Sequence, residues 1–190
     1  MRVVSTSPGA LSSAVRSGPR TRPRYRASVN ERRYAGVIAI YDGRIVLVRE
    51  RHDHWGGAFW NIPSGTVESH ETPVLAAVRE LAEETGLAVR PDDLQLVGTS
   101  STQGMEHRSL AWNFTTLIGD PALAVDDPDG LVLEARWFTR GEAVALLKRL
   151  PYRPLCEPVV AYLTDSVDPG SHWHFEGADA DPVVTPAGSE

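Results

Sequence analysis

The sequence predicts an α/β domain in which helices cover both faces of a β-sheet. The first observation is an apolar run at 34–41 that is hydrophobic on both faces, as expected of a central strand. The second is a helical pattern at 71–87, and the third is a series of alternating segments after it that predict further strands. With 190 residues, the chain is long enough for one domain with tails and a sizeable core.

The domain is expected to begin with a hairpin. Asp42-Gly43 separates the apolar runs 34–41 and 44–49, and this dipeptide favours a two-residue turn between antiparallel strands. The segment 52–59 (HDHWGGAF) is then predicted to be a loop, and 60–65 (WNIPSG) a short strand that ends in a turn.

The clearest helix follows this turn. In ETPVLAAVRELAEETGL, Pro73 suits the first helical position and Gly86 suits the cap beyond the last turn. The apolar residues between them recur at helical spacing: Val74, Ala77, Val78 and Leu81. The pattern predicts an amphipathic helix with one face against the core.

The second half of the domain mixes strands and helices. We expect strands near 94–102, 109–118 and 134–138, with an acidic loop at 119–130 before the last of them. Helices are predicted at 140–150 and 157–163 and would close the domain.

The two ends of the chain differ in composition from the middle. Residues 1–33 are rich in Ser, Pro, Gly and Arg without an amphipathic period, which predicts a disordered N-terminal tail. Residues 164–190 contain scattered Pro, Gly and acidic residues, which predicts a flexible acidic C-terminal tail. The predicted domain therefore spans 34–163.

The charge and the cysteine content indicate which classes of partner and which cellular location to expect. Residues 1–33 carry +7 of a net charge of −6, so the remainder carries −13, which disfavours nucleic acid as a partner of a broad surface. An acidic protein that handles phosphates needs a metal ion. The chain has a single cysteine and no apolar run near the roughly 18 residues that would span a membrane, so we expect a cytoplasmic protein without a membrane partner.

The helix at 71–87 gathers three carboxylates on one face. Glu83 and Glu84 follow Glu80 at i+3 and i+4, where side chains are neighbours and like charges repel. Arg79, four residues before Glu83, is the one basic residue beside them. Oxygen ligands so placed favour Mg²⁺ or Mn²⁺ over zinc. The alternative interpretation of the helix alone is a solvated, charged face.

The carboxylates belong to a longer motif. It consists of Gly65, five residues, Glu71, seven residues, and then the run 79–87, RELAEETGL. This motif resembles the signature of the Nudix hydrolase family at every fixed position, although Ser64 stands where the family usually has a glycine. The resemblance implies a Nudix-type α/β/α sandwich with a mixed β-sheet between helices.

The resemblance also implies an activity. Nudix hydrolases cleave a nucleoside diphosphate linked to another group, with water attacking phosphorus. We expect a Mg²⁺- or Mn²⁺-dependent pyrophosphohydrolase whose partner is a small nucleotide: a nucleoside triphosphate, a nucleotide sugar, ADP-ribose or a related compound. Two rivals are a non-catalytic module that binds nucleotide or ADP-ribose and an isomerase of isoprenoid diphosphates. The isomerase would need a catalytic cysteine, and Cys156 lies late in the chain. The sequence leaves the oligomeric state undecided, and a homodimer is one of the alternatives.

Roles for single residues follow from the same resemblance. The implied metal ligands are the Gly65 carbonyl and the helix carboxylates Glu80, Glu83 and Glu84, with Arg79 holding a glutamate in position. Glu80 or Glu84 would accept the proton from water. The resemblance also implies one more acidic ligand from a later loop, for which Glu134 is preferred over Glu106, Asp126, Asp127 and Asp129.

Three further groups of residues have more than one interpretation. Arg108 is a candidate for a phosphate contact, and Trp55 is a candidate for stacking on a base. The group Glu50, His52, Asp53 and His54 is interpreted as part of a surface loop rather than as a metal cluster.

Overall fold

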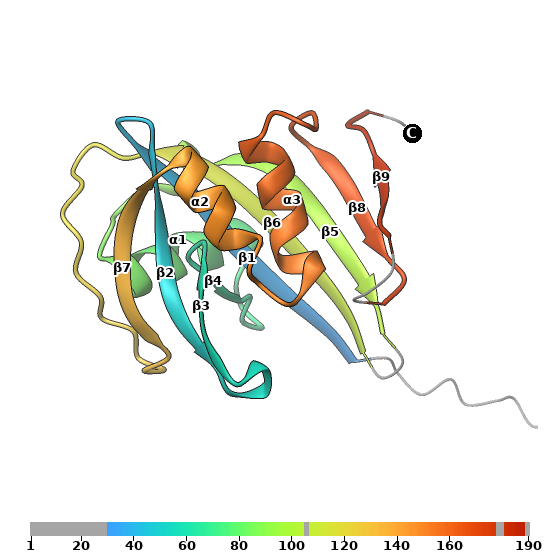
Figure 1. Cartoon of the computed structure of the whole chain (residues 1–190), viewed down its shortest axis with the longest axis horizontal. Helices are drawn as coiled ribbons and strands as arrows, with labels where there is room; N and C mark the ends of the chain where they lie inside the picture. The colour runs from blue at the N-terminus through green and yellow to red at the C-terminus, as the bar shows by residue number, and fades with distance from the viewer. Residues whose placement is uncertain (1–29, 105–106, 178–180, 189–190) are drawn as a thin grey trace, which may run out of the picture.

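A mixed β-sheet forms the middle layer of the computed structural model, which describes residues 30–104, 107–177 and 181–188 (Figure 1). Its strands are β1 (Asn30–Tyr41), β2 (Arg44–His52), β3 (Gly57–Asn61), β4 (Ser64–Thr66), β5 (Gln95–Gln103), β6 (His107–Leu117), β7 (Val132–Thr139), β8 (Ser171–Phe175) and β9 (Val183–Thr185). They lie in the order β3-β2-β1-β6-β5-β8-β9, with β4 also paired to β1 and β7 to β2. The pairs β1–β6 and β5–β8 are parallel and the other pairs are antiparallel.

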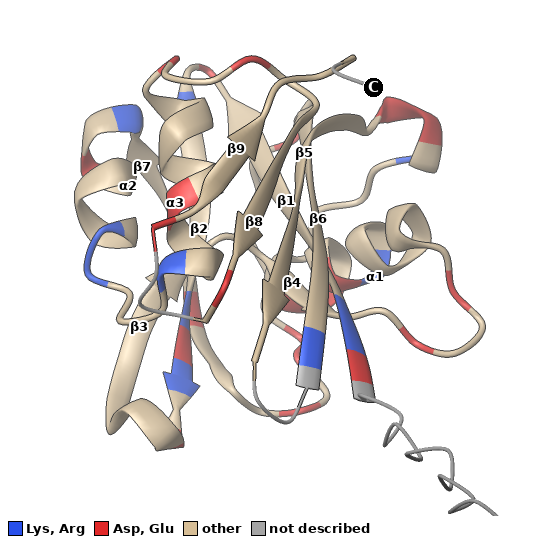
Figure 2. Cartoon of the chain, turned by 90° about the vertical axis from the view of Figure 1, so that its right-hand side faces the viewer, with Lys and Arg blue, Asp and Glu red and all other residues tan. Residues whose placement is uncertain are grey.

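Helices cover both faces of this sheet. Helix α1 (Pro73–Thr85) lies on one face, and α2 (Arg140–Leu147) and α3 (Arg153–Leu163) lie on the other (Figures 1 and 2). Successive residues of β1 point to opposite faces, so Val37 packs in the core beneath α1 and Ile38 in the core beneath α2 and α3. Both side chains are fully buried, which confirms the central strand and the α/β/α sandwich.

Helix α1 has the predicted limits. The Thr72 side chain accepts a hydrogen bond from the Leu75 N–H at the N-terminus, and Pro73 follows in the first turn. Gly86 adopts φ 76°, a left-handed conformation that glycine tolerates, and its N–H closes the last turn on the Ala82 carbonyl. Ala76, Ala77 and Leu81 are buried, and Glu84 is buried with them, so the carboxylate side of α1 adjoins its buried side and is not turned out to solvent.

Both predicted tails contribute to the sheet. Strand β1 begins at Asn30 and pairs with the start of β6, whereas residues 1–29, the rest of the predicted N-terminal tail, lie outside the described residues. Strand β8 pairs with β5, and the Trp173 and Phe175 side chains are buried. The expectation of a flexible tail from 164 onward therefore does not hold for 171–175, because alternate apolar side chains there extend the core.

Two local predictions also need correction. The segment predicted to be a loop at 52–59 contains a short 3₁₀ helix, η1 (Asp53–Trp55), and the start of β3. Helix α3 begins at Arg153 rather than at 157, with Pro154 in its first turn and Pro158 inside it. None of the helices in the described residues is long and apolar enough to cross a membrane.

Candidate active site

A cavity of about 460 Å³ opens beside α1 where β1 and β2 diverge. The carboxylate face of α1 forms one side, and strand residues and the loop before β7 form the others. The lining residues are Tyr34, Ala35, Gly36, Glu50, His52, Asn61, Ile62, Ser64, Gly65, Thr66, Glu68, Arg79, Glu80, Glu84, Ala111, Asn113, Asp127, Asp129, Leu131 and Leu155. Among the residues predicted for the site, Gly65, Arg79, Glu80 and Glu84 therefore meet in one place.

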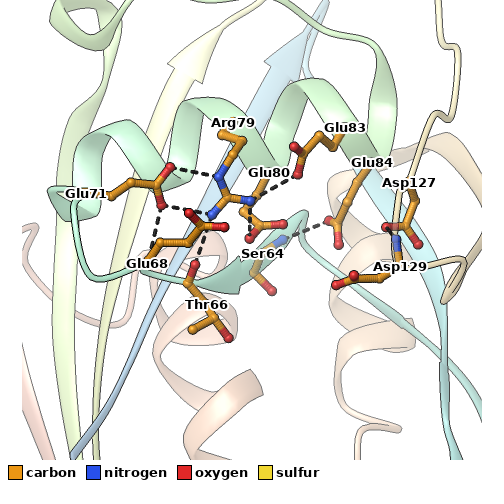
Figure 3. A network of polar contacts seen from close by, with 10 residues as sticks. All are labelled: Ser64, Thr66, Glu68, Glu71, Arg79, Glu80, Glu83, Glu84, Asp127 and Asp129. Carbon is orange, nitrogen blue, oxygen red and sulfur yellow. Dashed lines mark hydrogen bonds and ion pairs between the residues drawn. The ribbon is translucent and has the colours of Figure 1, made fainter.

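Arg79 organises the carboxylates of α1 (Figure 3). Its Nε and Nη2 donate to the two oxygens of Glu71 at 2.8 and 2.9 Å, and Nη2 also donates to the Thr66 carbonyl at 3.0 Å. Its Nη1 donates to Glu80 at 2.8 Å and to Glu83 at 3.0 Å. Glu71 therefore positions the guanidinium, which in turn holds two of the three helix carboxylates.

Strand β4 contacts Glu84 and Glu80 of the carboxylate face. The Ser64 N–H donates to Glu84 Oε2 at 2.9 Å, which fixes the deepest carboxylate of the helix. Gly65 faces Glu80 so closely that a methyl group on Gly65 would lie 2.1 Å from Glu80 Oε1. Glycine is required here by close approach, since the Gly65 backbone needs no positive φ.

Glu50 is an additional carboxylate of this site that the sequence interpretation missed. It lies on β2 and lines the cavity together with Glu80 and Glu84. Burial, followed by the negative charges of Asp127 and Glu80, raises the pKa of Glu50 to about 7. Burial raises the pKa of Glu84 to about 9 despite the hydrogen bond from Ser64. The site therefore concentrates negative charge in a poorly solvated place.

The acidic loop before β7 reaches the cavity through Asp127 and Asp129. The Asp127 carboxylate accepts hydrogen bonds from the N–H groups of Asp129, Leu131 and Val132, so it shapes the loop. The Asp129 carboxylate has no hydrogen bond or ion pair within the described residues. Glu106, the other loop residue considered as a ligand, lies outside the described residues.

Glu134, the preferred extra ligand, is not brought to this site. It pairs in register with Arg49, and Glu50 pairs with Val132. Because neighbouring residues of a strand point to opposite faces, Glu134 lies on the Arg49 side of the sheet, away from Glu50. There it forms ion pairs with Arg49, at 2.7 Å, and with Arg136.

The two predicted substrate contacts also lie away from the cavity wall. Arg108 is exposed near the start of β6, opposite Gln103 of β5. The Trp55 ring packs against His52, with centroids 4.3 Å apart, and stacks on Tyr152. Trp55 therefore supports His52, which lines the cavity, instead of lining the cavity itself.

The residues fit a hard divalent cation by their chemistry. Glu50 and Glu84 have no cationic partner in the described part of the chain apart from His52, whose Nε2 lies 3.3 Å from Glu50 Oε2. No three His, Cys, Asp or Glu side chains of the described residues already converge as a metal cage, since Glu80 and Glu83 are turned to Arg79. Buried carboxylates without neutralising charge are stabilised by a bound cation, and an oxygen donor set favours Mg²⁺ or Mn²⁺.

Comparison with known proteins shows similarity to one family, in agreement with the motif in the sequence. A family model described as "NUDIX domain" matches residues 30–157. The chain is 36% identical over 113 residues to an NAD-capped RNA hydrolase NudC of Mycobacterium tuberculosis, covering 60% of this chain and 34% of that protein. It is 33% identical over 109 residues to a putative 8-oxo-dGTP diphosphatase 3 of the same species, covering 55% of this chain and 49% of that protein. The chain thus spans half or less of these relatives.

A solved structure supports the same fold. The NUDIX hydrolase from Nitrosomonas europaea superposes with a TM-score of 0.59 at 20% identity, covering 74% of this chain and 93% of that one. Strands β8 and β9 lie beyond the residues that the family model matches.

Proposed function

Because this chain belongs to the NUDIX family, we propose that it is a Mg²⁺- or Mn²⁺-dependent pyrophosphohydrolase of nucleoside diphosphate derivatives. Water attacks one phosphorus of the diphosphate, the bond from that phosphorus to the bridging oxygen breaks, and the water proton passes to a carboxylate. The products are a nucleoside monophosphate and either the phosphorylated remainder or pyrophosphate.

The concentration of carboxylates in the cavity is the observation that supports this proposal. Glu50, Glu80 and Glu84 line one small cavity, and burial raises the pKa of each. Such an arrangement is costly to the folded protein unless a cation binds there. This cost supports a bound cation as part of the proposed function.

The proposed ligands are Glu80, Glu83 and Glu84, the Gly65 carbonyl and, in place of Glu134, Asp129. Bound at these groups, Mg²⁺ or Mn²⁺ supplies positive charge for the phosphate oxygens and lowers the pKa of water.

The chain's own residues provide the positioning. Arg79 holds Glu80 and Glu83 at a fixed separation, and Ser64 holds Glu84. We propose Glu80 or Glu84 as the proton acceptor. Both line the cavity, whereas the other helix carboxylate, Glu83, is not among the lining residues.

The rival functions have less support. The helix keeps all of its carboxylates, which a module that only binds nucleotide would not require. Cys156, the thiol that an isomerase would need, is buried in the core beneath α2 and α3, and burial raises its pKa to about 11. A relative named as an NAD-capped RNA hydrolase brings RNA-linked nucleotides into the range of substrates to test. Hydrolysis of NAD-capped RNA would contradict the prediction that the chain has no nucleic-acid partner.

A substrate panel tests the proposal directly. The purified chain should release nucleoside monophosphate or pyrophosphate from at least one of a set of nucleoside triphosphates, nucleotide sugars, ADP-ribose, dinucleotides and NAD-capped RNA, and chelator should abolish release. Glu83→Gln and Glu84→Gln should each lower kcat/KM by at least ~10² while Glu176→Gln, an exposed carboxylate at the end of β8, should not. Glutamine variants as active as wild type would overturn the metal role of the helix.

A further inference from the structure

Two asparagines in the cavity have hydrogen-bonding groups without partners. Asn61 of β3 is 1% exposed and Asn113 of β6 is 9% exposed, and both line the cavity. The Asn61 side-chain oxygen has no hydrogen-bond partner. Within the described residues the Asn113 carboxamide makes no hydrogen bond. A buried polar group left unpaired is costly, so the Asn61 oxygen, with the unpaired Asn113 carboxamide on the wall of the same cavity, points to a ligand that pairs with them.

The strand register relates the two asparagines to Gly36, a residue of β1 without a side chain. Gly36 of β1 pairs with Ser64 on one side and with Asn113 on the other. Ser64, Gly36 and Asn113 thus form a row across β4, β1 and β6. Asn61 Nδ2 donates to the Ser64 hydroxyl at 3.2 Å, so Asn61 lies at the Ser64 end of this row. A methyl group on Gly36 would lie 2.9 Å from Ile62 Cδ1 and 3.4 Å from the Asn113 Oδ1. It would also lie 3.0 Å from Ser64 Cβ, so the Ile62 and Ser64 side chains already occupy the space that a side chain at 36 would need.

The row is connected to the carboxylate face. Ser64 contacts Asn61 through its hydroxyl and Glu84 through its N–H. Tyr34 and Leu155 add an aromatic ring and an apolar side chain to the cavity lining. A ligand whose phosphates approach Glu84 can thus place a planar group in the same cavity, where Tyr34 and Leu155 offer apolar contacts and the two carboxamides are available to its edge.

We propose that Asn113, together with Asn61 of the same cavity, recognises the edge of a planar substrate group that carries an amino nitrogen next to a hydrogen-bond acceptor. A carboxamide offers two N–H donors and an acceptor oxygen, so it pairs in two hydrogen bonds with such an edge. The inference rests on the proposed function and names the substrate class: nucleotides whose base, or whose attached carboxamide, has an amino group. The adenine ring and the nicotinamide carboxamide share this chemistry.

Pairs of substrates that differ only at the amino group show which planar group the asparagines recognise. The pairs are ATP and ITP, GTP and XTP, and NAD and its deamido form, each differing by an amino group replaced by oxygen. Wild type should prefer the amino member of at least one pair by about 10-fold or more in kcat/KM, as one good two-bond contact provides about 1–3 kcal/mol of discrimination. Equal rates within every pair would overturn the assignment.

Variants connect the preference to the two residues. Asn113→Leu and Asn61→Leu should each bring the preferred pair to within about two-fold, mainly by slowing the amino member. Because leucine replaces a carboxamide with unpaired groups by an apolar side chain of similar size, the Tm of Asn113→Leu should stay level or rise. Thr115→Val on the same strand removes a hydrogen bond to the Ile38 carbonyl, so its Tm should fall while the preference stays. A preference kept in Asn113→Leu, or an equal loss on both members with a lower Tm, would contradict the proposal.

Direct binding keeps the test independent of hydrolysis. If wild type hydrolyses no nucleotide, the proposed function fails, yet calorimetric titration with AMP, IMP, nicotinamide mononucleotide and its deamido form still measures recognition. Tighter binding of one amino member that is lost in Asn113→Leu supports the inference. Equal binding of both members, as expected if water alone satisfies the two carboxamides, rejects it.

Discussion

Gly65 lies against the carboxylate of Glu80 with no space for a side chain between them. A methyl group at 65 would stand 2.1 Å from Oε1 and 2.3 Å from the carboxylate carbon of Glu80. This glycine of β4 therefore sets how near the proposed carbonyl ligand can come to the helix, although Glu80 lies fifteen positions later in the sequence.

Gly65→Ala should disrupt this relationship. Either Glu80 leaves Arg79 or β4 moves outward, and a displacement of about 1 Å in a reacting geometry can cost ~10² in rate. We expect kcat/KM to fall by that order and Mn²⁺ to bind more weakly in calorimetric titration. Gly119→Ala is the control, since a methyl group there meets nothing within 4 Å. Full activity of Gly65→Ala would show that the close approach is not needed.

Arg79→Lys tests the guanidinium as a positioning group. A lysine ammonium cannot contact Glu71, Glu80, Glu83 and the Thr66 carbonyl together in the way that the planar fork of Arg79 does. We expect kcat to fall by about 10-fold or more and stability to fall by about 2 kcal/mol in urea unfolding, because charged hydrogen bonds are lost. Arg90→Lys, in an exposed pair with Asp93, should change neither quantity. If Arg79→Lys had the same kcat as wild type, the proposed positioning role of Arg79 would be wrong.

Asp129→Asn and Glu134→Gln distinguish the two candidates for the additional ligand. Asp129 lines the cavity and Glu134 is paired with Arg49 on the other side of the sheet. The Asp129 variant should therefore raise the Mn²⁺ concentration needed for half-maximal activity by about 10-fold or more. The Glu134 variant should stay within about two-fold of wild type. The reverse result would restore Glu134 as the ligand and require β7 to rearrange.

Stability in the presence of chelator should depend on pH through Glu84. Its pKa is raised from 4.5 to about 9 in the folded protein, so the folded state binds more protons than the unfolded state between these values. The contribution to stability is thus complete below pH 4.5 and is lost as pH rises toward 9. Glu50 adds the same trend up to about pH 7.

Thermal unfolding of Glu84→Gln measures that contribution. With chelator, the Tm of wild type should fall relative to the variant from pH 5 to pH 9, because glutamine cannot ionise. Mg²⁺ should raise the wild-type Tm most at high pH, since the metal binds the deprotonated carboxylate. Parallel pH profiles for the two proteins would contradict the raised pKa.

Local patterns predicted some parts of the molecule well. Helix α1 follows from Pro73, Gly86 and the apolar spacing between them, and the carboxylate face follows from helical geometry. Glu50 was missed because RERHD has the composition of a surface loop, and its burial depends on the pairing of β2 with distant β7. The preference for Glu134 over Asp129 was wrong because the pairing of β7 with β2, including the bulge after Arg49, turns Glu134 to the Arg49 side, and the sequence does not show this register.

Phe175→Ala tests whether the C-terminal strand belongs to the folded domain. SHWHF alternates polar and apolar residues, a strand pattern that the Pro-, Gly- and acid-rich surroundings concealed. Phe175 is fully buried and stacks on Trp173, with ring centroids 6.3 Å apart. Removing such a ring should cost about 3–5 kcal/mol in urea unfolding. Val184→Ala on exposed β9 should change stability by less than about 0.5 kcal/mol. If 164–190 were a flexible tail, the two variants would unfold alike, at the wild-type midpoint.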